Sequence, residues 1–97
     1  MVCALDPARN QLFLGVGQNL TQPATAFSDA IVAIDLDTGA VKWSFQATAG
    51  DAWHAGCQSD PQINCPMPEG PDFDFGAGAI LTDLPGSGGQ VVIAGDK

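Results

Sequence analysis

The chain has 97 residues, with three Lys plus Arg against eleven Asp plus Glu and a formal net charge of −8. Binding to nucleic acid or to an anionic membrane surface needs clustered cations, so this composition argues against both partners. Twelve Gly, seven Pro and apolar runs of strand length predict an all-β chain rich in turns, without a membrane span. The first residues lack the basic start and long apolar core of a signal peptide, so an export signal is expected outside this segment.

The first element in chain order is a stretch of two short strands at residues 4–17, ALDPARNQLFLGVG. It has a short apolar start, a turn that contains Pro7, a Gln, an apolar strand at residues 12–14 and a closing Gly. Pro and Gly are the strongest local signals for turns and chain ends. The stretch therefore reads as a β-hairpin.

The second element is a hairpin at residues 30–45. Residues 30–34, AIVAI, form an apolar run that is long enough for a buried strand and too short for a typical helix. Asp35, Asp37, Thr38 and Gly39 supply the chemistry of a turn. Residues 41–45, VKWSF, alternate apolar and polar side chains and return as the second strand. This pattern explains the hairpin but not the choice of Trp43.

A long irregular segment follows at residues 48–75. Cys57 and Cys65 bracket a polar, Pro-containing stretch and could close a small loop by a disulfide, which would fit an exported protein and leave Cys3 unpaired. His54 is the only His and has no Cys or His nearby at metal-ligand spacing, so we read it as a loop residue without a catalytic role.

The last element, residues 79–95 (AILTDLPGSGGQVVIAG), repeats the plan of residues 4–17, with the strand at 91–93 in the place of the strand at 12–14. Four short antiparallel strands that recur every several tens of residues are typical of a β-propeller. Two similar hairpins also arise by chance in β proteins, so the repeat alone leaves the propeller open.

Residues 33–43, AIDLDTGAVKW, resemble the tryptophan-docking repeat of the quinoprotein alcohol dehydrogenases, Ala-x-Asp-x-x-Thr-Gly-x-x-x-Trp. The matching positions are Ala33, Asp35, Thr38, Gly39 and Trp43. In that family each Trp packs on the peptide plane of a Gly in a neighbouring motif and joins adjacent blades. The resemblance implies that Trp43 fastens blade to blade and that Gly39 leaves room for a neighbour's ring. Some propellers with related repeats are scaffolds without a cofactor.

The resemblance extends over most of the chain. The stretch GVGQN at residues 15–19 is similar to the Gly-x-Gly-Asn turn of pyrroloquinoline quinone (PQQ) dehydrogenases, and DFDFGAGAILTDLP at 72–85 is similar to the stretch that carries their catalytic aspartate. The segments DAW at residues 51–53 and GPDFDFGA at 70–77, which flank a Cys-containing insertion, resemble the polyvinyl-alcohol-dehydrogenase branch of that family. The resemblance implies an eight-bladed antiparallel β-propeller that holds PQQ and Ca²⁺. Residues 1–97 would be a fragment of little more than one blade, with blade strands at about 2–47 and 77–97 and an excursion at about 48–75.

The resemblance also proposes site residues. Asp74 stands at the position of the catalytic base, which takes the proton of an alcohol substrate while hydride leaves for PQQ. In an extended strand Asp72 would share a face with Asp74, opposite Phe73 and Phe75, and could assist the ion. Asn19, or Gln18 in strict register, would bind Ca²⁺ together with Asp74. The alternatives are that Asp72 and Asp74 are solvated turn acids, and that Asn19 stabilises a turn.

Three functions follow from these observations. The first is a piece of a periplasmic or secreted bacterial PQQ-dependent alcohol dehydrogenase, whose partners would be the missing blades, an alcohol and a cytochrome c electron acceptor. The second is a propeller-repeat scaffold or assembly protein of the outer-membrane assembly type. The third is a degenerate fragment without activity. Asp74 together with the Gly-x-Gly-x-Asn stretch favours the first, because a scaffold has no reason to keep both.

Overall fold

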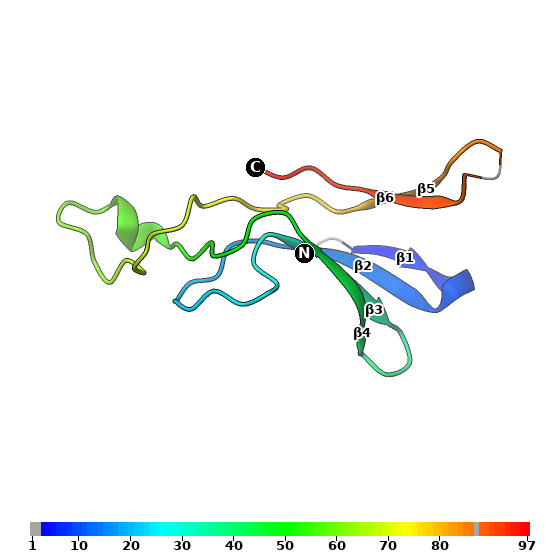
Figure 1. Cartoon of the computed structure of the whole chain (residues 1–97), viewed down its shortest axis with the longest axis horizontal. Coiled ribbons are helices and arrows are strands. Elements are labelled where there is room, and N and C mark those ends of the chain that lie inside the picture. The colour runs from blue at the N-terminus through cyan, green and yellow to red at the C-terminus, as the bar shows by residue number, and fades with distance from the viewer. Residues whose placement is uncertain (1–2, 87) are drawn as a thin grey trace.

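The computed structural model describes residues 3–86 and 88–97 and shows an all-β chain. Its elements are β1 (Cys3–Asp6), the 3-10 turn η1 (Pro7–Arg9), β2 (Gln11–Val16), β3 (Ala30–Asp35), β4 (Val41–Gln46), the 3-10 turn η2 (Ala55–Gln58), β5 (Ile80–Asp83) and β6 (Gln90–Ile93). Strands β1 to β4 form one antiparallel sheet in chain order, and β5 and β6 form a separate antiparallel hairpin (Figure 1). This arrangement confirms the predicted all-β, antiparallel, blade-like fold.

Residue 2, at which the expected strand span 2–47 begins, lies outside the described residues. No helix within residues 3–86 and 88–97 has the length and apolar character needed to cross a membrane.

Strand β3 is the centre of the small core. It is paired with β2 on one edge and with β4 on the other, and its first four residues are all buried. Phe13 of β2 is 2% exposed and adds the largest apolar side chain to this core. A strand enclosed in this way needs a continuous apolar run, which is what residues 30–34 provide. The predicted hairpin is therefore present, with strand bounds one residue longer at each C-terminal end.

Asp35 closes the turn between β3 and β4. Its Oδ1 accepts hydrogen bonds from the backbone N–H groups of Asp37 (2.9 Å) and Thr38 (2.9 Å) and from the Thr38 hydroxyl (3.1 Å). The N–H of Thr38, followed by that of Asp37, holds the pKa of the Asp35 carboxyl below its usual value. Gly39 adopts a φ of 74° in the same turn, a conformation that favours glycine.

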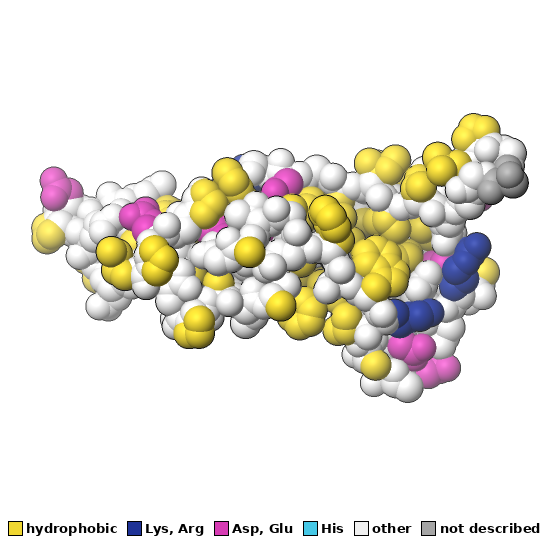
Figure 2. Space-filling model, in the orientation of Figure 1, with side chains coloured by type: hydrophobic (Ala, Val, Ile, Leu, Met, Phe, Trp, Pro, Cys, Tyr) yellow, Lys and Arg dark blue, Asp and Glu magenta, His cyan; other side chains and the backbone are white. Residues whose placement is uncertain are grey.

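An apolar groove of about 600 Å³ lies between the four-stranded sheet and β6. Its lining includes Phe13, Trp43 and Phe45 from the sheet and Val92 from β6. The Trp43 ring contacts the Phe13 ring at a centroid distance of 5.6 Å, yet Trp43 remains 43% exposed. Figure 2 shows hydrophobic side chains gathered along the middle of this face of the molecule. The sheet thus presents uncovered apolar surface on the side of β4.

Residues 48–75 leave the sheet and return to it. In Figure 1 this segment runs from green to yellow and extends far beyond the strands. It contains η2 and two isolated β-bridges but no strand longer than one residue. The C-terminal end of this segment, residues 72–75, reaches the candidate site at the end of β2.

Candidate functional site

The segment that carries Asp74 docks onto the end of β2. Gly17 and Asp74 form an isolated antiparallel bridge. A Cβ on Gly17 would lie 2.8 Å from Cγ of Asp74, and a Cβ on Gly15 would lie 2.6 Å from Cβ of Phe75. Both distances are too short for any side chain, so the two glycines allow residues 74 and 75 to approach β2. The Gly-Val-Gly stretch at residues 15–17 was expected to form a turn. Instead, Gly15 and Val16 end β2, and Gly15 and Gly17 form the surface against which residues 74 and 75 lie.

Asn19 lies two residues beyond Gly17 and is bound to the start of the excursion. Its backbone N–H donates to the Asp51 carbonyl at 2.9 Å, and its own carbonyl accepts from the N–H of Trp53 at 2.8 Å. The side-chain Oδ1 accepts a hydrogen bond from the N–H of Thr25, which holds the loop that follows. Asn19 therefore stabilises a turn, and one lone pair of its amide oxygen is left for another partner. The half-buried Gln18 lies between the two bridged residues.

Asp72 and Asp74 do not alternate along a regular strand, which corrects the expected geometry. Asp72 has a φ of 61°, in the left-handed region, so the extended conformation required for a shared face is broken there. Its Oδ2 pairs with Nζ of Lys97 at 3.0 Å, while the Asp74 carboxylate lies against Gly17. Lys97 also donates its backbone N–H to the Asp74 carbonyl at 2.9 Å. The two acids thus have different surroundings.

Asp51 holds the backbone just before Asp74. Its side chain is fully buried, with Oδ1 accepting from the N–H of Asp72 at 3.1 Å and Oδ2 accepting from the N–H of Phe73 at 2.8 Å. Hydrogen bonds to a carboxylate are stronger than neutral ones. Asp51 was not among the predicted site residues, and its one signal in the sequence is its place in the DAW segment at residues 51–53.

Asp29 is a second fully buried acid, and it was not among the predicted site residues. Neither of its side-chain oxygens has a hydrogen-bond partner among the described residues. Burial, followed by the adjacent Asp51 carboxyl, raises the pKa of Asp29 from 3.8 to about 7, and the charges of Asp96 and Asp74 act in the same direction. Protonation of Asp29 removes the cost of two ionised carboxylates in one buried region.

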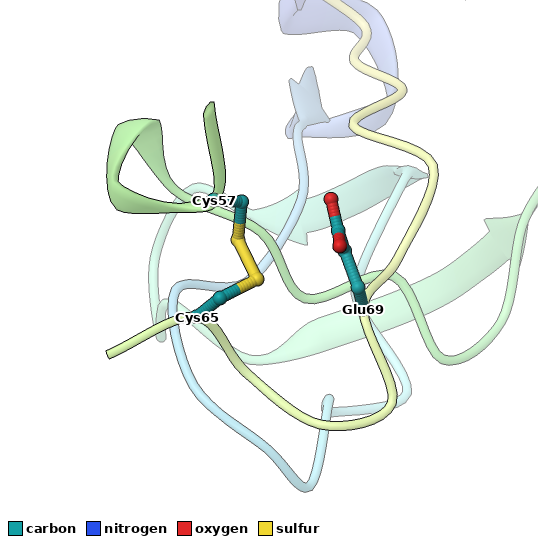
Figure 3. Close-up of side chains that lie close together, drawn as sticks. All are labelled: Cys57, Cys65 and Glu69. Atoms are coloured by element: carbon teal, nitrogen blue, oxygen red, sulfur yellow. A yellow bond between two sulfur atoms is a disulfide. The ribbon is translucent and has the colours of Figure 1, made fainter. Parts of the chain in front are cut away.

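Cys57 and Cys65 are joined by a disulfide that closes a loop of the excursion (Figure 3). Cys3 is free and exposed. Glu69 lies beside this disulfide, and the three residues are the one group of three potential metal ligands found in residues 3–86 and 88–97. Sulfurs already bonded to each other are not thiolates, so this group is not a metal site as it stands. His54 bonds the carbonyl of Asn64 and the N–H of Gly56 within the same loop, as expected for a loop residue.

The site as a whole joins three segments distant in sequence: residues 17–19, 51–53 and 72–75. Their junction places Asp74, a potential base, and Asn19, a neutral oxygen donor, at the same end of β2. Carboxylate and amide oxygens are ligands suited to Ca²⁺. The tryptophan motif lies elsewhere, on the β3–β4 hairpin, with Trp43 opposite Ala33 in the strand register.

Comparisons with known proteins agree with this architecture. Residues 2–70 match the family described as glucose/ethanol/alcohol dehydrogenase, β-propeller domain, of the PQQ type. The chain belongs to this family. The matched residues include Asn19 and the tryptophan motif and end before Asp72.

Two relatives are similar over 96% of this chain. A polyvinylalcohol dehydrogenase of Sphingopyxis sp. strain 113P3 is 37% identical over 95 residues, and one of Pseudomonas sp. is 34% identical over 93 residues. A quinohemoprotein alcohol dehydrogenase, ADH-IIG of Pseudomonas putida, is 41% identical over 59 residues, which are 52% of this chain and 8% of that protein. The chain spans 14% of the length of each polyvinylalcohol dehydrogenase. No solved structure matches the chain.

Proposed function

We propose that these 97 residues are part of the propeller of a PQQ-dependent alcohol dehydrogenase, in which Asp74 is the general base. The observation that carries the proposal is the position of the Asp74 carboxylate over Gly17, at the same end of β2 as Asn19. The similarity to named polyvinylalcohol dehydrogenases over 96% of the chain supports an alcohol as substrate, including a polymeric one. The complete protein that would contain this segment is called the full-length enzyme below.

The residues at the end of β2 fit the chemistry of the implied cofactors. Asp74 and Asn19 offer the hard oxygen donors that Ca²⁺ prefers, with Gln18 as the alternative amide. Asp72 is left out of this set because its carboxylate pairs with Lys97. The other ligands would come from other blades. When bound, PQQ supplies a hydride acceptor and Ca²⁺ supplies a Lewis acid.

Asp74 would act on the proton of the substrate hydroxyl. A carboxylate within hydrogen-bond reach of that hydroxyl accepts its proton while the carbinol C–H bond breaks. The bridge to Gly17 and the bond from Lys97 N–H to the Asp74 carbonyl hold the backbone of the base on both sides. Phe75 follows the base in the chain and is only 7% exposed, so it would exclude water from one side of Asp74.

The test is alcohol-dependent dye reduction by variants of the full-length enzyme with saturating PQQ and Ca²⁺. Asp74→Asn keeps the size of the side chain and removes the proton acceptor, so the rate should fall by about 10²–10⁴-fold. Asp72→Asn is the matched control: it releases Lys97 but leaves the base, so it should cost far less. A near-parental rate for Asp74→Asn would refute the base assignment and favour the non-enzymatic propeller scaffold.

Asn19 is tested separately, because its oxygen also accepts the bond from Thr25. Asn19→Ala should lose activity that excess Ca²⁺ partly restores, since a missing ligand weakens affinity more than chemistry. Asn19→Asp retains an oxygen for both partners and should remain closer to the parent. Activity loss in Asn19→Ala that no Ca²⁺ concentration changes would assign Asn19 to the turn alone.

The proposal extends to location and partners. A periplasmic or secreted enzyme fits the Cys57–Cys65 disulfide, because such bonds persist in oxidising compartments. A cytochrome c as electron acceptor is supported by one relative being named a quinohemoprotein. The remaining blades would cover the apolar side of β4, with Trp43 of the tryptophan motif at that contact.

A further inference from the structure

Asp51 connects the start of the excursion to its returning end. Its two oxygens accept the N–H groups of consecutive residues, Asp72 and Phe73, directly before the candidate base. Gly70 packs against it so closely that a Cβ there would collide with Oδ1 of Asp51 and lie 2.8 Å from its Cα. The N–H of Gly70 also donates to the Ala52 carbonyl at 2.9 Å. Asp72 and Phe73 are thus held on Asp51 by two hydrogen bonds, and Gly70 is held by a close contact with Asp51 and a hydrogen bond to Ala52.

Asp29 connects the same acid to the other side of the site. Its N–H donates to the carbonyl of Gly17 at 3.1 Å, and its carbonyl accepts from the N–H of Ala47 at 2.8 Å. Gly17 forms the isolated β-bridge with Asp74, and the Asp74 carboxylate lies against it. Asp29 has a φ of 47°, a left-handed conformation that Asp and Asn tolerate better than most residues. Burial, followed by the carboxyl of Asp51 and the charges of Asp96 and Asp74, raises the pKa of Asp29.

We infer that Asp51 is a positioning residue for Asp74, and that the backbone of Asp29 supports the Gly17 side of the same site. Asp51 fixes the backbone of Asp72 and Phe73, while the N–H of Asp29 binds the carbonyl of Gly17. The base and the glycine against which it lies are therefore each held by a buried acid. This inference rests on the proposed role of Asp74.

The link matters because general base catalysis depends on placement. A misplacement of about 1 Å can cost about 10²-fold in rate, even where no reacting group is removed. Asp51→Asn replaces one acceptor oxygen by an NH₂ group. Whichever way the amide turns, that NH₂ faces a backbone N–H, so one of the two bonds is lost.

The experiment is a double-mutant cycle in the full-length enzyme. Asp51→Asn alone should lower kcat by about 10–100-fold with little change in KM or in PQQ affinity. In the Asp74→Asn background the same substitution should have almost no further effect, because there is no base left to position. Asp60→Asn is the matched control: it makes the same chemical change at an exposed Asp of the same excursion, and it should leave kcat at the parental value.

Asp29→Asn is the conservative variant of the partner. It keeps both backbone hydrogen bonds of residue 29, and Asn tolerates the left-handed backbone. We expect kcat within about threefold of the parent. A loss as large as that of Asp51→Asn would overturn the backbone role of Asp29.

The outcomes separate this inference from the base assignment. A near-parental rate for Asp74→Asn sinks the base assignment, and the positioning role with it. If Asp74→Asn is impaired but Asp51→Asn is parental, or if the two losses multiply in the double variant, the positioning role alone is refuted. Should Asp51→Asn fail to fold, Asp51→Glu replaces it, because it keeps both acceptor oxygens but moves them by one methylene group. A parental kcat for Asp51→Glu would then be the refuting result.

Discussion

The segment expressed alone should associate with itself, because it is a blade without neighbours. Its surface is 5882 Å², whereas a compact monomer of 9.9 kDa would expose about 5200 Å². Its radius of gyration is 15.7 Å, against about 12–13 Å for a compact domain of this length. The excess reflects the long excursion and the uncovered sheet.

The exposed apolar side chains of β4 determine how much free energy self-association can gain. Val41, Trp43 and Phe45 are 47%, 43% and 60% exposed. Covering them removes roughly 300 Å² of apolar surface from water, which is about 7 kcal/mol. This is comparable with the whole stability of a small domain, typically about 5–15 kcal/mol. A second copy, or aggregation, is the route to this gain when the neighbouring blades are missing.

Light scattering after size-exclusion chromatography, combined with a thermal melt, tests this expectation. The 97-residue chain should be unfolded, aggregated or dimeric and larger, with apparent mass rising with concentration. The double variant Val41→Thr/Phe45→Gln should associate less, since it keeps the strand but loses apolar surface. A strict monomer with a sharp cooperative melt would refute the reasoning.

Three further outcomes are expected. Thiol labelling of protein from an oxidising compartment should detect Cys3 only, and labelling of Cys57 and Cys65 without reductant would rule out the bridge. Trp43→Ala should lower the unfolding free energy of the full-length enzyme by about 3–5 kcal/mol in denaturant titrations; a loss of PQQ affinity at unchanged stability would instead make Trp43 a cofactor-wall residue. Folding raises the pKa of Asp29 from 3.8 to about 7. The stabilisation that comes from protonated Asp29 is therefore fully present below pH 3.8 and is lost as pH rises through 7. The loss in unfolding free energy is at most about 4 kcal/mol. Asp29→Asn should therefore flatten the fall in melting temperature over this range, and an unchanged slope would contradict the pKa.

The strands were predictable because their signals are local. The apolar run of β3 and the Asp35 turn each involve only a few consecutive residues. Strand β4 follows that turn and shows the two-residue alternation of apolar and polar side chains that is typical of a strand. The geometry around Asp72 was not predictable from alternation. Its N–H is held by Asp51, 21 residues earlier in the chain, and its side chain by Lys97, 25 residues later. No pattern in a single sequence shows such a contact before the fold brings the segments together.

The apolar surface of β4 and the two buried acids have separate roles, and substitutions should affect them independently. The apolar side of β4 is exposed in this chain and needs neighbouring blades to cover it, whereas Asp29 and Asp51 are fully buried within this chain alone. The first set therefore governs assembly, and the second governs the internal placement of residues 72–74 against Gly17. Changes at Val41 or Phe45 should alter association and stability while Asp74 keeps its placement. Changes at Asp51 should do the reverse, because its hydrogen bonds lie wholly within this chain.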